Sequence, residues 1–254
     1  MKIRILGSGT SSGVPRIGND WGACDPAEPR NRRSRASMLV STETTRILID
    51  TSPDMREQLL AAEVDTVDAV IWTHDHADHC HGIDDLRQVF HALGRPVRGL
   101  ARPETCRRIS ERFDYVFAGR PGYRQTATID ILPNEIRIGD ITVRSVDQPH
   151  GTIYSAGLRF EHGGKAIGYA TDFNEMTRDM QFLYQDLRIW IVDALRRRPH
   201  PTHPHLDQVL EWVRDFRPIR AALMHMDNSM DYRSLRAELP AHVEPGYDGL
   251  ELTA

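Results

Sequence analysis

The sequence predicts an α/β fold of the α+β kind, in which two mixed sheets pack face to face with helices outside. Two observations predict this class. Apolar runs rich in Val and Ile, typical of buried strands, recur along the chain, whereas helical patterns alternate with them only in places. The second half also repeats the order of the first, with strands followed by strand–helix units, which suits two packed sheets better than one doubly wound sheet.

The expected strands are short runs with period-two or continuous apolar character. They cover residues 2–6, 37–41, 46–50, 68–72, 141–146, 154–160, 166–170, 188–192 and 219–224. Helical periodicity predicts helices over residues 53–62, 83–93, 103–113, 177–185 and 205–215. Pro53 and Pro103 fall where helices begin well. Residues 11–35, rich in Gly, Ser, Pro and Arg, are expected to form a long loop, and loops above about 15 residues are commonly functional or disordered.

Composition describes an ordinary globular protein, which we expect to be one domain over residues 1–254. The hydrophobic fraction is 40% and the formal net charge is −4, so the overall basic excess that marks most nucleic-acid-binding domains is missing.

No apolar run approaches the roughly 18 residues needed to span a bilayer, and the first residues read directly as a strand, so we expect a cytoplasmic protein. Cys24, Cys80 and Cys106 form no CxxC pair and suit reduced thiols.

The stretch THDHADH, residues 73–79, places three histidines and two aspartates in seven positions directly after an apolar strand. A polar loop that caps the next helix is the simpler explanation for any one of these histidines. For the whole pattern a metal site is the better explanation. Crowded imidazoles repel one another when protonated, whereas a divalent metal binds neutral imidazole and carboxylate oxygen well.

One metal ion takes about four ligands, so further ligands are expected elsewhere in the chain. Three candidates each lie just beyond a predicted strand: His150 in VRSVDQPHG, Asp172 in AIGYATD and His225 in AALMH. His150 or His225 alone could equally be a hydrogen-bonded core histidine. Their shared position at strand ends favours one metal site.

These residues and the two-sheet pattern resemble the metallo-β-lactamase-fold hydrolases over nearly the whole chain. The resemblance implies a four-layer αββα sandwich with two divalent metal ions, Zn or Mn, at the sheet edges. It implies one set of ligands for each ion, with Asp172 bridging both. The first set is His74, His76 and His150; the second is Asp78, His79 and His225. Asp78 is also expected to serve catalysis. Two ions about 3.5–4 Å apart can hold a bridging hydroxide as a nucleophile at neutral pH.

Asp50, at the end of the strand RILID, has two explanations of similar weight. It could accept the second ring N–H of a metal-bound histidine, as carboxylates near metals commonly do. It could equally cap the helix that begins near Pro53.

The ends of the chain resemble one branch of these hydrolases. LGSGTSSGVP, residues 6–15, and PGYDGLEL, residues 245–252, are similar to the phosphodiesterase branch that includes the phosphoribosyl cyclic phosphodiesterase of the carbon-phosphorus lyase pathway. Ribonuclease Z, the transfer-RNA 3′ endonuclease, shares a looser form of the first motif. By itself the first motif could be a tight turn that needs positive φ at Gly7, Gly9 or Gly13. The chain departs from the branch in having Cys24 alone where members often carry a cysteine-rich zinc site.

HPTHPHLDQVL, residues 200–210, places three histidines before a predicted helix. Alignment with the phosphodiesterase branch selects His203, whose imidazole would protonate the leaving alkoxide. The alternative is that these histidines merely enter the helix in a proline-stiffened loop.

The run PRNRRSR supplies Arg30, Arg32, Arg33 and Arg35, whose guanidinium groups could clamp an anionic substrate. A solvated basic face is the more common role of such a run.

The leading hypothesis is therefore a dinuclear metal-dependent phosphodiesterase that acts on a small phosphate diester, with cyclic diesters included. The alternatives are a transfer-RNA 3′ endonuclease, a thioesterase or lactonase of the same fold, and a non-catalytic carrier. An endonuclease needs a basic surface or arm for its large polyanion, which the net charge of −4 disfavours, and no obvious Gly/Pro-rich basic arm stands out. The expected partner is a small phosphodiester substrate, without membrane or nucleic acid, and a homodimer is a reasonable default.

Overall fold

The computed structural model describes all 254 residues, which form two mixed seven-stranded sheets. The first sheet has the order β14-β1-β2-β3-β4-β5-β6. Its strands are β1 (Lys2–Gly7), β2 (Ser37–Ser41), β3 (Arg46–Ile49), β4 (Ala69–Trp72), β5 (Val97–Ala101), β6 (Ala127–Ile131) and β14 (Glu251–Thr253). The second sheet has the order β13-β12-β11-β10-β9-β8-β7. Its strands are β7 (Glu135–Ile138), β8 (Ile141–His150), β9 (Ile153–His162), β10 (Lys165–Ala170), β11 (Ile189–Asp193), β12 (Arg220–Met224) and β13 (Val243–Pro245).

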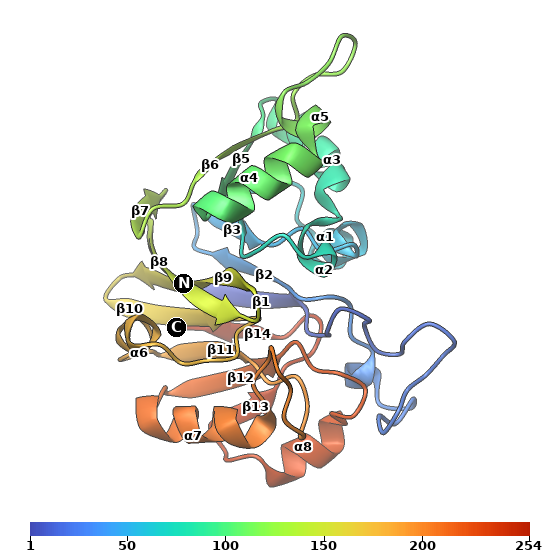
Figure 1. Cartoon of the computed structure of the whole chain (residues 1–254), viewed down its shortest axis with the longest axis vertical. Coiled ribbons are helices and arrows are strands. Elements are labelled where there is room, and N and C mark those ends of the chain that lie inside the picture. Colours follow the sequence, from blue (N-terminus) through green and yellow to red (C-terminus); the bar gives the residue numbers. More distant parts are fainter.

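Helices cover the outer face of each sheet, which gives four layers (Figure 1). On the first sheet lie α1 (Met55–Ala62), α2 (Ala77–Cys80), α3 (Leu86–Leu93), α4 (Pro103–Arg112) and α5 (Asp114–Phe117). On the second lie α6 (Arg178–Leu183), α7 (Leu206–Phe216) and α8 (Tyr232–Glu238). Two short 3₁₀ helices, η1 (Pro29–Asn31) and η2 (Ile83–Asp85), complete the regular structure. The predicted sandwich of two mixed sheets flanked by helices is confirmed.

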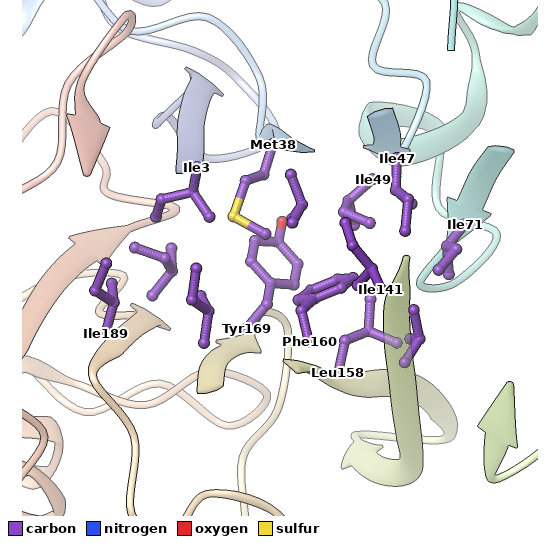
Figure 2. Close-up of a cluster of buried hydrophobic side chains, with 14 of the residues drawn as sticks. Ile3, Met38, Ile47, Ile49, Ile71, Ile141, Leu158, Phe160, Tyr169 and Ile189 are labelled. Carbon is purple, nitrogen blue, oxygen red and sulfur yellow. The ribbon is translucent and has the colours of Figure 1, made fainter. Parts of the chain in front are cut away.

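Strand alternation explains why this sequence forms four layers. Successive side chains of a strand point to opposite faces, so a fully apolar strand buries both faces. Ile47 and Ile49 of β3 face the second sheet, whereas Leu48 packs under the helices of the first. In β11, Ile191 joins the core between the sheets and Trp190 the core beneath α6 and α7. Figure 2 shows the central core, with Ile3 and Met38 of the first sheet facing Tyr169 and Phe160 of the second.

Strand direction places the functional edge of the sandwich. In the first sheet β3, β4, β5 and β6 run parallel, and in the second β10, β11, β12 and β13 run parallel. The carboxyl ends of parallel strands share one sheet edge, which is where ligands bind in open α/β sheets.

Each expected strand and helix has a counterpart, with boundary shifts of a few residues. The expected helix start at Pro53 was early, because Asp54 precedes the first turn and α1 begins at Met55. Pro103 does occupy the first turn of α4. Residues 11–35 form turns and isolated bridges around the single 3₁₀ turn η1, in line with the predicted loop. Across the whole chain, no helix combines the length and apolar character that a membrane span requires.

Candidate metal centre

The candidate site lies at the shared edge where strands of both sheets end. In the first sheet, Asp50 follows β3 and the THDHADH stretch follows β4. In the second sheet, four side chains stand at strand ends: His150 of β8, Asp172 beyond β10, Asp193 of β11 and His225 beyond β12.

Three of these residues have a left-handed backbone. The φ angle is 63° at Asp50, 53° at Asp172 and 57° at His225. Residues other than glycine rarely adopt positive φ, and such conformations gather at functional sites, where the surrounding contacts hold them. Here each turn sets the direction in which the side chain leaves the sheet edge.

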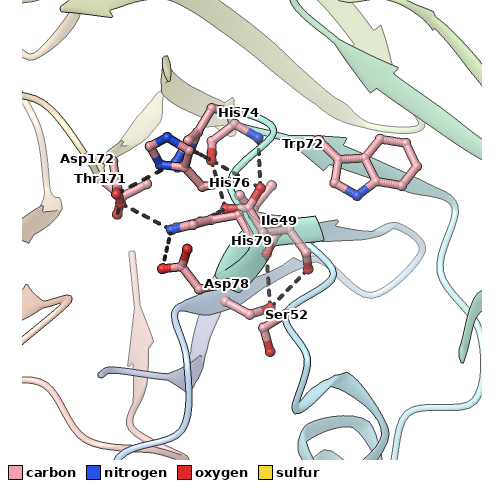
Figure 3. A network of polar contacts seen from close by, with 12 residues as sticks. Ile49, Ser52, Trp72, His74, His76, Asp78, His79, Thr171 and Asp172 are labelled. Atoms are coloured by element: carbon pink, nitrogen blue, oxygen red, sulfur yellow. Dashed lines mark hydrogen bonds and ion pairs between the residues drawn. The ribbon is translucent and has the colours of Figure 1, made fainter. Parts of the chain in front are cut away.

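The carboxylate of Asp172 lies between two groups of histidines. Its Oδ2 atom is 3.7 Å from Nε2 of His74 and 3.5 Å from Nε2 of His150. Its Oδ1 atom is 3.3 Å from Nε2 of His79 and 3.4 Å from Nε2 of His225. Figure 3 shows Asp172 facing the histidines of the THDHADH stretch. One carboxylate thus presents a separate oxygen to each group, which is one way in which a carboxylate can be shared by two metal ions.

His76 and Asp78 complete the two groups. Nδ1 of His76 lies 3.3 Å from Nε2 of His150. Oδ2 of Asp78 lies 3.3 Å from Nε2 of His79 and 3.5 Å from Nε2 of His225. Within each group the candidate ligand atoms all lie within 4.8 Å of one another; the groups are His74, His76, His150 with Asp172, and Asp78, His79 with His225. The structure therefore brings together all seven residues selected from the sequence.

Unpartnered nitrogens at the centre of the site test whether these residues fit metal ions. The Nε2 atoms of His74, His79 and His225 are buried without a hydrogen-bond partner. A buried polar atom left unpaired costs on the order of 1–3 kcal/mol. Imidazole nitrogens and carboxylate oxygens form a ligand set that divalent zinc accepts well. The side chains present therefore fit a pair of divalent cations.

Outer hydrogen bonds fix the histidine rings. Asp50 Oδ2 accepts from Nδ1 of His79 at 2.8 Å, and Asp50 also accepts from the Thr73 hydroxyl. That hydroxyl lies 3.0 Å from Nδ1 of His74, so Asp50 holds two rings in place, one directly and one through Thr73. The Thr202 carbonyl accepts from Nδ1 of His150 at 2.9 Å. These contacts engage Nδ1 of each ring, so Nε2 is the nitrogen that faces the centre of the site. Of the two explanations for Asp50, the structure places it against His79, and the cap residue of α1 is Asp54.

The two groups differ in charge. Burial and the neighbouring His79 hold the pKa of His74 well below its usual value, and burial lowers that of His150. Burial would also lower the pKa values of His79 and His225, but the Asp172 and Asp78 carboxylates outweigh it. They raise the pKa of His79 well above normal and that of His225 to about 9. Without metal ions, protons on the second group balance carboxylates that metal cations would otherwise neutralise.

His203 enters the site from the loop before α7. Its Nε2 atom is 3.9 Å from Asp172 Oδ2, and its Nδ1 atom is 2.7 Å from Asp193 Oδ2. Asp193 also accepts from the backbone N–H of Asp172 at 3.1 Å. Sequence reasoning missed Asp193, although it ends the buried strand IWIVD just as Asp50 ends RILID. The other two histidines of this segment, His200 and His205, lie outside both metal-ligand groups.

An arginine from α4 braces the histidine loop. Arg112 donates to the backbone carbonyl of Asp75 at 2.6 Å and to its carboxylate at 2.9 Å. The Cys80 thiol lies 3.4 Å from the same carbonyl, and burial raises its pKa to about 12. Since Asp75 separates His74 from His76, these contacts hold the backbone between two candidate ligands.

The four arginines of the run have partners of their own. Arg33 is buried, and its guanidinium donates to the Met230 carbonyl at 2.7 Å, so it anchors the loop. Arg30 lies over the Tyr232 ring and Arg32 over the Trp21 ring. Arg35 pairs with Asp54 at 3.0 Å. None of the four forms an ion pair or hydrogen bond with the histidine cluster, so a solvated and structural run describes them better.

The two terminal motifs meet in space. Asp248 of PGYDGLEL accepts from the backbone N–H of Ser8 at 2.9 Å and from that of Ser34 at 2.7 Å. Among the three glycines of the first motif, only Gly13 has positive φ, at 65°. Gly7 is needed for close approach instead, because a Cβ there would lie 1.9 Å from the Arg35 carbonyl oxygen. The first motif also contacts the chain next to a candidate metal ligand. The N–H of Thr10 donates to the carbonyl of Met226, which follows His225, at 3.2 Å.

Comparison with protein families gives one match that covers most of the chain. The family model described as a beta-lactamase superfamily domain matches residues 45–226, which include every candidate metal ligand.

Two curated relatives show how varied the assigned roles are. An octanoyltransferase of Porphyromonas gingivalis is 32% identical over 99% of this chain, but the match spans only 51% of that protein. The chain therefore spans about half the length of this relative. A coenzyme PQQ synthesis protein B of Xanthomonas campestris is 31% identical, with 100% of both chains covered.

Solved structures share the fold over the whole chain. A diphosphatase from the PhnP family has a TM-score of 0.90 at 31% identity, covering 100% of this chain and 97% of its own. Zn²⁺-bound PqqB from Methylobacterium extorquens has a TM-score of 0.80 at 19% identity, with 100% of both chains covered. Human tRNase Z, short form, has a TM-score of 0.73 at 14% identity, covering 100% of this chain and 99% of its own. The last two show likeness of fold alone.

Proposed function

Because the chain belongs to the beta-lactamase superfamily, we propose that it is a metal-dependent hydrolase that cleaves a small phosphate diester. The observation that carries the proposal is the position of Asp172, which presents one carboxylate oxygen to each of two histidine groups. Similarity to a PhnP-family diphosphatase over the full chain supports chemistry at phosphorus.

We infer that His74, His76 and His150 hold one metal ion, that Asp78, His79 and His225 hold a second, and that Asp172 contacts both. Two divalent ions supply Lewis acidity toward a phosphoryl oxygen and lower the pKa of a bound water toward 7. Zinc is supported by the ligand types and by the zinc-bound PqqB of similar fold, and manganese is the alternative.

The protein itself would contribute a proton donor, His203, and the residue that orients it, Asp193. Asp193 accepts from Nδ1 of His203, which leaves Nε2 directed toward Asp172 and the space between the histidine groups. The carboxylate holds the ring in one orientation through this hydrogen bond. His203 can therefore hold a proton at Nε2 and deliver it to the departing alkoxide oxygen, after which the neutral ring remains paired with Asp193.

A second candidate function rests on the full-length similarity to PQQ synthesis protein B. Under this alternative the same centre would serve coenzyme synthesis without turnover of phosphate diesters. The similarity to PQQ synthesis protein B covers both chains in full, so it carries more weight than two other similarities. The octanoyltransferase is about twice as long as this chain, and human tRNase Z shares the fold at 14% identity.

A substrate panel separates these functions. The metal-loaded protein would be assayed against bis(p-nitrophenyl) phosphate, a 2′,3′-cyclic nucleotide, a thioester and a lactone. The proposal expects hydrolysis of both diesters at rates well above those for the thioester and lactone. Preference for the thioester or lactone would replace it with another hydrolase function, and no turnover of any substrate at full metal occupancy would favour the coenzyme-synthesis alternative.

A further inference from the structure

A second concavity lies away from the metal centre, between α3 and the loop that joins α5 to β6. Its volume is about 470 Å³, and none of the residues that line it is a candidate metal ligand. Three arginines and three aromatic side chains dominate its walls: Arg87, Arg120, Arg124, Phe90, Tyr115 and Tyr123. In Figure 1 the joining loop, drawn in green, projects beyond α5 at the top of the molecule.

The projecting loop is ordered by its own backbone. Arg120 and Tyr123 exchange two backbone hydrogen bonds of 2.9 and 2.8 Å around Pro121 and Gly122. Proline fixes a negative φ, and Gly122 adopts a φ of 83°, so the pair suits a tight turn. At the base of the loop, Thr126 N–H donates to the Val116 carbonyl at 3.0 Å. The loop therefore holds Tyr123, 66% exposed, and its neighbouring arginines in a defined position.

The charges around this pocket are unbalanced. Arg87 and Arg124 form no ion pair and no side-chain hydrogen bond, and Arg120 pairs with Asp114, outside the pocket. The lining holds one carboxylate, Asp84, against three arginines. Burial and the neighbouring Asp84 raise the pKa of Tyr115 to about 12, so its hydroxyl stays neutral and adds no negative charge. A basic concavity on a chain with a net charge of −4 is suited to an anion.

We propose that this pocket binds a planar aromatic anion of mononucleotide size. Guanidinium groups bind phosphate through paired hydrogen bonds, so Arg87 and Arg124 would take the phosphate. Tyrosine rings offer flat apolar faces, so Tyr115 and Tyr123 would contact the aromatic ring. The volume falls within the range of about 300–1,000 Å³ usual for small-molecule sites. This binding site goes beyond the proposed function, because it requires no turnover and uses none of the metal-centre residues.

Calorimetric titration of the metal-loaded protein with AMP tests the proposal, with adenosine and inorganic phosphate as partial probes. AMP should bind at least tenfold more tightly than either partial probe. The double variant Arg87→Ala/Arg124→Ala should weaken AMP binding at least tenfold while leaving bis(p-nitrophenyl) phosphate hydrolysis unchanged. The matched control is Arg214→Ala/Arg236→Ala, which removes two exposed arginines on α7 and α8 and should leave AMP binding intact.

Three results would overturn the proposal. Unchanged AMP affinity in the pocket variant, together with competitive inhibition of diester hydrolysis by AMP, would assign AMP to the metal centre. Equal losses in the pocket variant and the control would show general attraction to a basic surface. Absence of AMP binding at millimolar concentration would show that the pocket does not recognise this class of ligand.

Discussion

Oδ2 of Asp50 lies 2.8 Å from Nδ1 of His79, and both side chains are fully buried at the candidate metal centre. The carboxylate also accepts from the backbone N–H and the hydroxyl of Thr73, so it fixes the start of the histidine loop and one ring of the second group. Through this contact, the end of strand β3 fixes the position of a candidate metal ligand.

Asp50→Asn should weaken metal binding about 10–100-fold, the range typical for partners of metal-bound histidines. An amide cannot stabilise the metal-bound ring as a carboxylate does, while it keeps a similar shape in the buried position. Zinc affinity measured by competition with a chromophoric chelator checks this. Asp65→Asn, a change at an exposed carboxylate, serves as the control, and equal affinities in the two variants would show that Asp50 only supports the fold.

His203→Ala should slow diesters with alkyl leaving groups about 10²–10⁴-fold, because an alkoxide needs a proton to depart. The loss on bis(p-nitrophenyl) phosphate should be far smaller, since p-nitrophenolate leaves unprotonated. Asp193→Asn should follow the same pattern more weakly, because an amide oxygen can still accept from the Asp172 N–H while the orientation of the His203 ring is disturbed. Steady-state kcat on the two substrate types tests whether His203 protonates the leaving group. Equal losses on both substrates would show that it does not.

Arg112→Ala should lower metal affinity at the first group, since it frees the backbone between His74 and His76. The expected loss is about tenfold, with partial recovery in Arg112→Lys, which keeps the charge but not the fork of donors. Arg107→Ala provides the matched control, because Arg107 lies on the same helix and pairs only with exposed Glu104 and Glu111. Unchanged metal content at limiting zinc in Arg112→Ala would contradict this role.

The metal-free protein should lose stability as pH rises from 6.5 to about 9. The pKa of His225 is about 9 in the folded state, above its usual 6.5. The folded state therefore binds this proton more tightly than the unfolded state does. The resulting stabilisation is complete below pH 6.5 and is lost as the pH rises to about 9. The raised pKa of His79 acts in the same direction. Thermal unfolding of the metal-free protein should therefore occur at a lower temperature at pH 9 than at pH 6.5. The metal-loaded protein should not show this trend, and parallel curves for the two forms would contradict the account.

The sequence predicted the sandwich because its central strands carry strong apolar patterns. RILI and AVIW have no polar residue beyond Arg46, and both are buried on two faces. Five strands escaped prediction: β5, β6, β7, β13 and β14. In β5, VRGLA, arginine and glycine interrupt the apolar pattern, while β6 (ATIDI) and β7 (EIRI) include charged residues and are only partly buried. The last two strands, β13 and β14, have three residues each, and β13 includes Pro245.

The cluster of histidines and aspartates was predictable because these residues at strand ends are read directly from the sequence. Asp193 was accessible by the same reasoning but gave no motif beyond one acid after an apolar run. The role of Arg33 was not accessible, because its burial against Met230 depends on a contact between segments nearly two hundred residues apart. The turn RPGYR at residues 120–124 also did not stand out, because the pocket that it forms needs Arg87 of α3 as part of the opposite wall.

Turnover measured against metal equivalents tests the central claim most directly. Metal-free protein would be titrated with zinc, and separately with manganese, while bis(p-nitrophenyl) phosphate hydrolysis and bound metal are measured on the same samples. The account predicts that activity rises mainly with the second equivalent, is abolished by chelator, and is absent in Asp172→Ala at any metal concentration. Binding of a single ion, or hydrolysis that persists in Asp172→Ala with two ions bound, would contradict a shared carboxylate at a two-metal centre.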